Sequence, residues 1–279
     1  MTRVLSGWTA LSALLLLLLV PVPARAQAND DPATLKPAEP DFTLVGLPTS
    51  LRLPTFRSSF RVTHRFTRPL NDDFGDVFAD FFGIDSGAII GLEYRFGIVK
   101  NGQVGILRQN SKTIQFLGQY SVLRQSAGAP VDVSAIATIE GTNNFKDSYS
   151  PAIGAILSRT IGEVAAFYLE PIWVNNTSTL PKDLVDENDT FMVGVGARIR
   201  VRPTVYIVGE VAPRSGNKDV VPGQEGVMHG SFAIEKRAGA HMFQLNFSNA
   251  FGTTMANIAR GGGAGNDWYL GFNITRKFF

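Results

Sequence analysis

Twelve short segments of this chain alternate apolar with polar residues, and this rhythm constrains the fold more than any other feature. In the segment 190–201, Phe191 and Val193 fall on odd positions, whereas Arg198 and Arg200 fall on even ones. A period of two places these sets on opposite faces of a β-strand. The predicted strands are 56–66, 87–96, 103–109, 112–122, 131–141, 151–160, 165–175, 190–201, 203–213, 226–236, 240–248 and 268–279.

The connections between these segments are alternately long and short. The long ones are 67–86, 142–150, 176–189, 214–225 and 249–267, and the short ones are 97–102, 123–130, 161–164, 202 and 237–239. One tight turn, Asn110-Ser111, falls on the long-loop side. Bacterial outer-membrane barrels have long external loops and short periplasmic turns. The pattern predicts an all-β fold: a closed, antiparallel, up-and-down transmembrane barrel of about twelve strands, with both termini in the periplasm.

Aromatic placement separates this barrel from a soluble sandwich, which also alternates apolar and polar faces. Phe56 and Phe66 bracket the first apolar face, and Trp268 and Phe278 bracket the last one. Rings at both ends of membrane strands form the two interfacial girdles of a barrel. The apolar faces are therefore predicted to contact lipid.

Charged side chains on the polar face are predicted to line the lumen. On a soluble sandwich the same residues would form an ordinary solvated surface. Inside a barrel they form either a narrow pore with weak charge preference or a closed, salt-bridged interior. These residues are Arg57, Arg61, Arg65, Glu93, Arg95, Glu140, Glu170, Arg198, Arg200, Glu210 and Glu235.

Residues 1–26 are typical of a secretory signal peptide, with Arg3, an apolar run at 10–20 and small residues at Ala24 and Ala26. A retained membrane anchor is the alternative, but the run is about half of the ~20 residues that a spanning helix needs. The expected location is the outer membrane of a Gram-negative-type bacterium.

The remainder divides into a flexible, proline-rich periplasmic lead-in at 27–50 and the barrel at 51–279. The chain has 26 Lys+Arg and 24 Asp+Glu, and the two bases Arg3 and Arg25 lie in the leader. The processed chain is therefore near neutral, which gives no electrostatic reason to expect nucleic acid as a partner. Cysteine is absent, so thiolate metal sites and cysteine nucleophiles are excluded.

The segment 267–279 resembles the terminal strand of outer-membrane barrel proteins, whose final aromatic residue is read by the barrel assembly machinery. The resemblance implies an assembly signal in Trp268, Phe272, Phe278 and Phe279. Phe279 is one residue out of phase with the apolar face, so either Phe278 carries the signal or a bulge resets the phase.

Motifs within 63–95 resemble a family of bacterial outer-membrane β-barrels that is known as a domain of unknown function. They are Thr63-His64-Arg65-Phe66, Gly75-Asp76-Val77-Phe78 and the run from Phe81 to Ala88. The resemblance covers most of the processed chain. It implies a fold and a location, and it brings no activity.

Residues 73–82 break the strand rhythm with apolar side chains at helical spacing: Phe74, Val77, Phe78, Phe81 and Phe82. The spacing predicts a short amphipathic helix in the first external loop. Its function is either a plug or lid over the barrel mouth or a foot in the outer leaflet. A helix that simply packs on the rim is the alternative.

Other patterns are weak. The acidic cluster Asp72, Asp73, Asp76, Asp80 and Asp85 does not match an EF-hand loop, so no metal and no cofactor are expected. The glycine run 261–265 lacks the Lys-Ser/Thr of a P-loop and predicts a flexible loop.

His229 is predicted to face the lumen near Ser231 and Glu235, but all three lie along one strand, and no oxyanion loop is evident. An enzyme is therefore not expected. The favoured function is a narrow passive channel or uptake protein for small solutes. A structural or docking barrel with a closed lumen is the alternative, and an outer-membrane lipid hydrolase is third. The expected partners are outer-membrane lipids, the barrel assembly machinery and small solutes.

Overall fold

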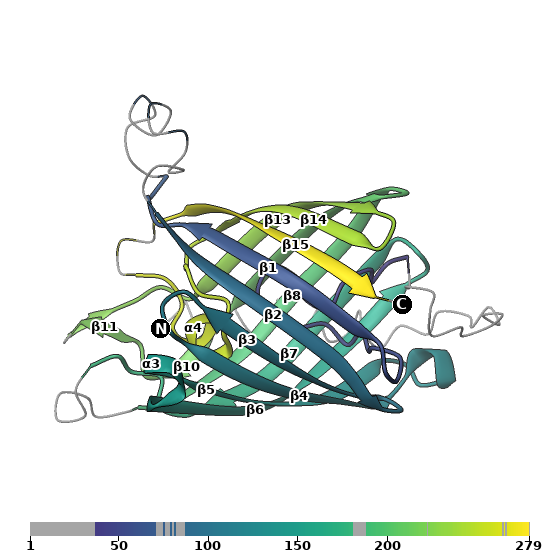
Figure 1. The fold of residues 1–279 in the computed structure, drawn as a ribbon, viewed down its shortest axis with the longest axis horizontal. Coiled ribbons are helices and arrows are strands. Elements are labelled where there is room, and N and C mark those ends of the chain that lie inside the picture. The colour runs from purple at the N-terminus through teal and green to yellow at the C-terminus, as the bar shows by residue number, and fades with distance from the viewer. Residues whose placement is uncertain are drawn as a thin grey trace, which may run out of the picture.

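The computed structural model describes residues 37–70, 75, 79, 81, 87–180, 188–221, 223–263, 265 and 267–278. Within them the chain forms a closed antiparallel β-barrel whose strands tilt around a common axis (Figure 1). The wall consists of β1 (Ser58–Phe66), β2 (Ala88–Val99), β3 (Gly102–Gln109), β4 (Ile114–Leu123), β5 (Asp132–Gly141), β6 (Asp147–Ile161), β7 (Ala165–Val174), β8 (Thr190–Arg202), β9 (Val205–Ala212), β13 (His229–Ala238), β14 (His241–Ser248) and β15 (Tyr269–Phe278). The predicted fold class is confirmed.

The first and last strands close the barrel. Arg61 of β1 lies opposite Glu93 of β2 on one side and opposite Thr275 of β15 on the other. Every wall strand is therefore hydrogen-bonded to two neighbours. Hydrocarbon offers no partner to a free backbone N–H or C=O, so closure is what a membrane requires.

The two ends of the barrel differ. The short-turn end carries the start of β1, the end of β15 and the 3-10 helix η2 (Gln125–Ala127). The long-loop end carries α3 (Thr142–Phe145), α4 (Met255–Arg260), β10 (Arg214–Gly216) and the hairpin of β11 (Asp219–Val221) and β12 (Gln224–Glu225). In Figure 1 the long-loop end is on the left and the C-terminus is on the right.

The strands turn alternate side chains inward and outward. In β13, Phe232 and Ile234 are 50% and 59% exposed, whereas Ala233 and Glu235 are 2% and 0% exposed. The outward band of exposed aliphatic and aromatic residues is the surface that lipid tails cover. Among the described residues, no helix combines the length and hydropathy needed to cross a bilayer.

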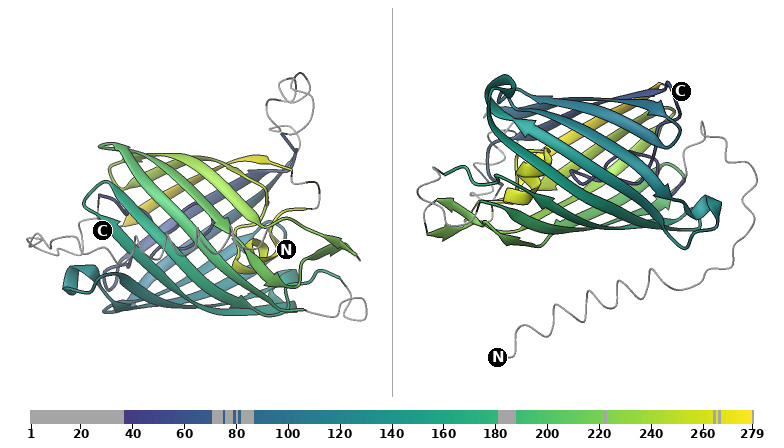
Figure 2. Two further views of the ribbon diagram at one scale, coloured as in Figure 1. Left: turned by 180° about the vertical axis from the view of Figure 1, so that it is seen from behind. Right: turned by 90° about the horizontal axis from the view of Figure 1, so that it is seen from below.

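Residues 38–53 lie inside the barrel, and we call them the strap (Figures 1 and 2). The strap is a hairpin: Thr43 bridges to Pro48, Leu44 N–H donates to Leu47 C=O at 2.8 Å, and Thr49 N–H donates to Phe42 C=O at 2.9 Å. Its tip, residues 44–47, is almost completely buried.

The strap corrects the expectation of a flexible lead-in at 27–50, at least for the described residues from 37 onward. Its prolines and acids are typical of flexible segments. However, Phe42, Leu44, Leu47 and Leu53 are apolar and are at most 3% exposed. Burial of these side chains offsets the entropy of ordering the hairpin. Residues 1–26 lie outside the described part of the chain, so the signal peptide stays a prediction.

Candidate functional site: the occupied lumen

The strap tip is held through its main-chain N–H groups by one carboxylate. Glu210 of β9 accepts hydrogen bonds from the N–H groups of Val45, Gly46 and Leu47 at 3.0, 2.8 and 3.1 Å. The imidazole Nε2 of His229 also lies 2.9 Å from this carboxylate. Consecutive backbone N–H groups that converge on an anion form a strong site because each bond is charge-assisted.

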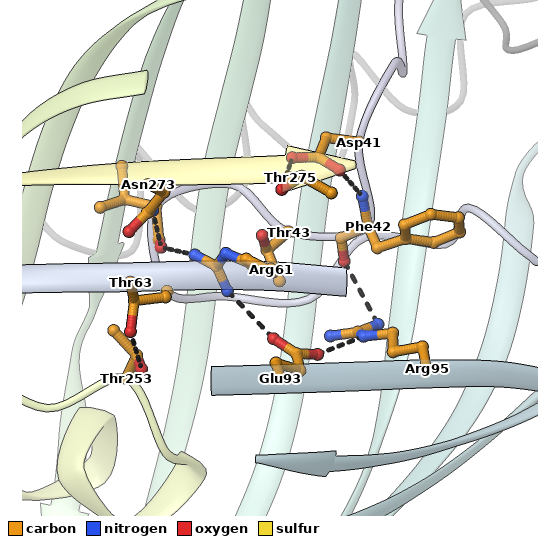
Figure 3. A network of polar contacts seen from close by, with 12 residues as sticks. Asp41, Phe42, Thr43, Arg61, Thr63, Glu93, Arg95, Thr253, Asn273 and Thr275 are labelled. Atoms are coloured by element: carbon orange, nitrogen blue, oxygen red, sulfur yellow. Dashed lines mark hydrogen bonds and ion pairs between the residues drawn. The ribbon is translucent and has the colours of Figure 1, made fainter. Parts of the chain in front are cut away.

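The carbonyl groups of the tip and of the preceding residue, Thr43, are held by other side chains of the wall. Arg198 donates to Thr43 C=O at 2.6 Å, and Gln244 donates to Leu44 C=O at 2.9 Å. Val45 C=O accepts from Arg61 at 2.5 Å and from Asn273 at 3.2 Å. Figure 3 shows how Arg61 and Asn273 approach the strap from the neighbouring strands β1 and β15.

Both arms of the hairpin are fastened toward the short-turn end. On the outgoing arm, Gln119 donates to Thr49 C=O at 2.9 Å, and Gln103 donates to Leu51 C=O at 3.1 Å. On the incoming arm, Thr275 donates to the Asp41 carboxylate at 2.8 Å. Lys277 lies 3.5 Å from the same group. Burial opposes ionisation of Asp41, but Lys277 and the nearby arginines outweigh it and lower the pKa of this carboxyl.

Two glycines of β8 make room for the leucines of the tip. A Cβ at Gly196 would lie 2.2 Å from Leu44 Cδ1, and a Cβ at Gly194 would lie 3.0 Å from both Leu47 Cδ atoms. A glycine inside a strand commonly marks such a close approach. The strap and the wall are therefore complementary in shape as well as in hydrogen bonding.

The helix α4 meets the strap tip from the long-loop end. Thr254 caps its N-terminus, with Oγ1 accepting from Asn257 N–H at 3.2 Å. Met255 and Ile258 are 5% and 1% exposed, and Ile258 Cδ1 lies 3.1 Å from the position of a Cβ on Gly46. Tip, helix and inward wall residues form one apolar cluster.

Two small cavities lie beside the strap among the described residues. They measure about 20 and 10 Å³, which is room for about one water each. A wider vestibule of about 740 Å³ lies beyond α4 at the long-loop end, lined by residues such as Tyr149, Asn176 and Arg260. The lumen is thus filled from one end by the strap and from the other by α4.

Most of the eleven charged residues that were predicted to line the lumen are buried there. Nine lie buried within the barrel: Arg61, Arg65, Glu93, Arg95, Glu140, Glu170, Arg198, Glu210 and Glu235. Arg57 is exposed ahead of β1, so its predicted lumen position is wrong. Arg200 is half-buried at the short-turn end and pairs with exposed Glu163 at 3.1 Å.

The buried charges are mostly paired. Arg198 binds both oxygens of Glu235 at 2.8 and 3.0 Å. Glu93 pairs with Arg61 at 3.3 Å and with Arg95 (Figure 3). Glu170 on β7 differs, because it is fully buried and has no hydrogen-bond partner for either oxygen among the described residues.

The expected helix at 73–82 lies largely outside the described residues, which include neither Phe74, Val77, Phe78 and Phe82 nor the cluster Asp72, Asp73, Asp76, Asp80 and Asp85. Gly75 and Ala79 are helical and exposed, and Phe81 is 68% exposed. The plug or lid role of this helix stays a prediction. In the described part of the chain, no three His, Asp or Glu side chains are grouped as a metal would need.

His229, Ser231 and Glu235 do not form a catalytic relay. Ser231 Oγ lies 3.2 Å from Nε2 of His229, but Glu210 contacts the same nitrogen, and Nδ1 has no partner among the described residues. A relay needs the hydroxyl and the acid on different ring nitrogens. Glu235 is instead occupied by Arg198.

The last strand keeps its alternation to the end of the described chain. Trp268, Phe272 and Phe278 have the outward parity, and Phe278 is 45% exposed. The pairing of β15 with β1 runs without a register shift through Phe278, so no bulge resets the phase there. Phe279 lies outside the described residues, and the assembly role of these aromatics stays a prediction.

The strap and α4 were not predicted from the sequence, although the sequence of each contains an apolar pattern that indicates it. The strap has apolar residues at alternate positions around Phe42 and Leu44. The helix has Met255, Ile258 and Ala259 at helical spacing, and Gly261 follows as its C-cap with a φ of 70°. Both segments are too short for periodicity alone to identify them.

Comparison with known families matches residues 44–278 to the family described as a membrane-bound beta barrel domain (DUF5777). The chain belongs to this family. The match to DUF5777 begins at the strap tip and includes every wall strand. No curated protein that was compared matches the chain in sequence.

Solved structures similar to this DUF5777 chain include the NanC porin and the outer membrane protein Omp33. The NanC porin, in a rhombohedral crystal form, is 7% identical, with a TM-score of 0.51 over 80% of this chain and 99% of that chain. Omp33 from Acinetobacter baumannii is 11% identical, with a TM-score of 0.46 over 80% of this chain and 98% of that chain. At this identity, the likeness to NanC shows a shared fold. The family description makes this a membrane-bound barrel.

Proposed function

We propose that this protein is an outer-membrane channel for small solutes that its own strap holds closed. The observation that carries the proposal is the way the lumen is filled. The inward side chains of the wall do not pair only with one another, because Glu210, Arg198 and Arg61 also bind the backbone of the strap. Where the strap does not cover them, these charged side chains of the wall need water as a hydrogen-bond partner.

The strap is placed so that it can leave without breaking the barrel. Its only backbone bridge, Thr43 to Pro48, lies within the strap itself and not with a described wall strand. Its arms are fastened toward the short-turn end. The hairpin can therefore leave through that end, with its arms first and its tip last. A barrel of this size lies between packed eight-stranded barrels and open sixteen-stranded porins, which leaves space for a narrow pore.

A docking barrel whose lumen never opens is the second candidate, and the tight packing around the strap tip favours it. The two candidates differ in what removal of the strap does. If the strap is a gate, its loss creates a hydrated path. If the strap is part of a permanent core, its loss collapses or unfolds the barrel.

Replacement of residues 41–50 by a Gly-Ser repeat of equal length tests the proposal. Such a repeat is flexible and has no side chains to fill the leucine sites. We expect steady ohmic current steps in planar bilayers from this variant and no steady conductance from the unchanged protein. Heat-modifiable migration in SDS gels is the control for a folded barrel. A folded variant that conducts no ions would overturn the proposal and support the docking barrel.

A further inference from the structure

Wall groups of different charge reach Val45 at the strap tip from different strands. Glu210 on β9 binds N–H groups of the tip and no carbonyl. Arg61 on β1 and Asn273 on β15 bind its carbonyl groups. In the order of the wall, β15, β14 and β13 separate β1 from β9. At Val45 the seat therefore has an acidic side from β9 and a donor side from β1 and β15, whereas the adjoining Thr43 C=O is bound by Arg198 of β8, the strand next to β9.

Val45 connects the two sides. Its N–H donates to Glu210 at 3.0 Å, and its C=O accepts from Arg61 at 2.5 Å. Both atoms belong to one residue, so they are joined through a single Cα. An α-amino acid carries its ammonium and its carboxylate on a single Cα in the same way. The free zwitterion can therefore make both contacts, and each becomes a pairing of opposite full charges.

Further groups extend both sides of this seat. Glu170 is buried without a hydrogen-bond partner among the described residues, and its Cβ lies 3.2 Å from the Cβ position of Gly194, which Leu47 also contacts. A second carboxyl group thus lies beside the strap tip, and neither of its oxygens has a partner among the described residues. On the other side, buried Arg65 donates to Asn273 at 2.9 Å and adds positive charge behind the carbonyl contact.

We infer that the seat vacated by the strap takes zwitterionic α-amino acids, with the ammonium group at Glu210 and the carboxylate at Arg61 and Asn273. This inference rests on the proposed channel function and names its substrate class. The strap then acts as an internal mimic of the solute, since its own peptide groups fill the contacts that the solute needs.

The test compares two solutes of similar size in a liposome-swelling assay with the Gly-Ser strap variant. Alanine carries both charges on one Cα, whereas lactamide, of similar size, carries neither. We expect alanine to enter at least threefold faster. Adding Glu210→Gln is expected to bring the two rates to about the same value, because the variant removes the charge that receives the ammonium group. Glu163→Gln, at an exposed position 69% accessible on its side chain, is the matched control and should keep the preference.

The outcomes separate this inference from the proposed function. Equal entry of both solutes into liposomes with the Gly-Ser variant would overturn the inference and leave the channel intact. A preference for alanine that survives Glu210→Gln would also overturn the inference, because the preference would then come from another part of the lumen. Entry of neither solute, together with no ion conductance from the folded variant, would remove the channel itself.

Discussion

Gly196→Leu is expected to push the strap tip out of its seat and to open the barrel to ions. Even a Cβ at this position would lie 2.2 Å from Leu44 Cδ1. The wall cannot yield, because Gly196 is paired with Tyr168 of β7 and with Glu210 of β9. Overpacking of a filled interior costs about 1–3 kcal/mol, and here the least restrained element is the hairpin.

The measurements for Gly196→Leu are single-channel conductance and the rate at which an added protease cuts the strap. Both should rise. Gly209→Leu is the matched control, since Gly209 has the outward parity and a Cβ there meets nothing within 4 Å. If Gly196→Leu and the control show the same rate of protease cleavage and the same lack of conductance, then Leu44 does not lie against Gly196.

Arg198→Met is expected to destabilise the barrel by about 3–5 kcal/mol. Arg198 is fully buried, binds both oxygens of Glu235 and also donates to Thr43 C=O. Methionine fills the space but leaves the Glu235 carboxylate buried without its counter-charge. The cost of burying the uncompensated Glu235 carboxylate sets the size of the destabilisation, more than the lost attraction between Arg198 and Glu235 does.

Urea unfolding of the protein in detergent or vesicles measures this change. Arg200→Met is the control, because the Arg200–Glu163 pair is at the surface and such pairs contribute about 0–1 kcal/mol. Adding Glu235→Gln to Arg198→Met should restore much of the lost stability, because it removes the uncompensated charge. Equal unfolding midpoints for the Arg198 and Arg200 variants would show that the buried pair is not formed.

The wall of the barrel could be predicted from the sequence because its signal is local. Alternation in segments such as 190–201 fixes which side chains turn inward, and the lengths of the connections fix which end of the barrel they occupy. The same parity placed Arg61 and Glu210 in the lumen. Arg57 was misplaced because it lies before the strand begins, where parity carries no information.

The contents of the lumen could not be predicted in the same way, because long-range contacts determine them. Glu210 is separated from Val45 by 165 positions in the chain. No local sequence pattern indicates that a carboxylate will accept hydrogen bonds from a turn so far away in the chain. Gly194 and Gly196 were a usable signal, because two glycines on the inward face of one strand indicate that another backbone or side chain comes close.

Composition misled the interpretation of the strap. Pro40 and Pro48 suggest an open chain, yet Pro48 closes the hairpin by its bridge to Thr43. Proline has no N–H to lose and restricts the unfolded chain, so it can favour a turn as readily as it prevents a helix. The apolar residues between the two prolines were the better guide.

A disulfide between the strap and the wall tests the occupied lumen most directly. The chain has no cysteine, so Leu44→Cys with Gly196→Cys introduces one thiol pair, and the shortened side chain at 44 relieves the contact with position 196. Leu44→Cys with Gly209→Cys, whose second thiol has the outward parity, is the control. Rapid, near-complete cross-linking of the first pair alone, measured on purified folded protein, is the result that a lumenal strap predicts. Free, reagent-accessible thiols at both positions of the first pair would contradict it.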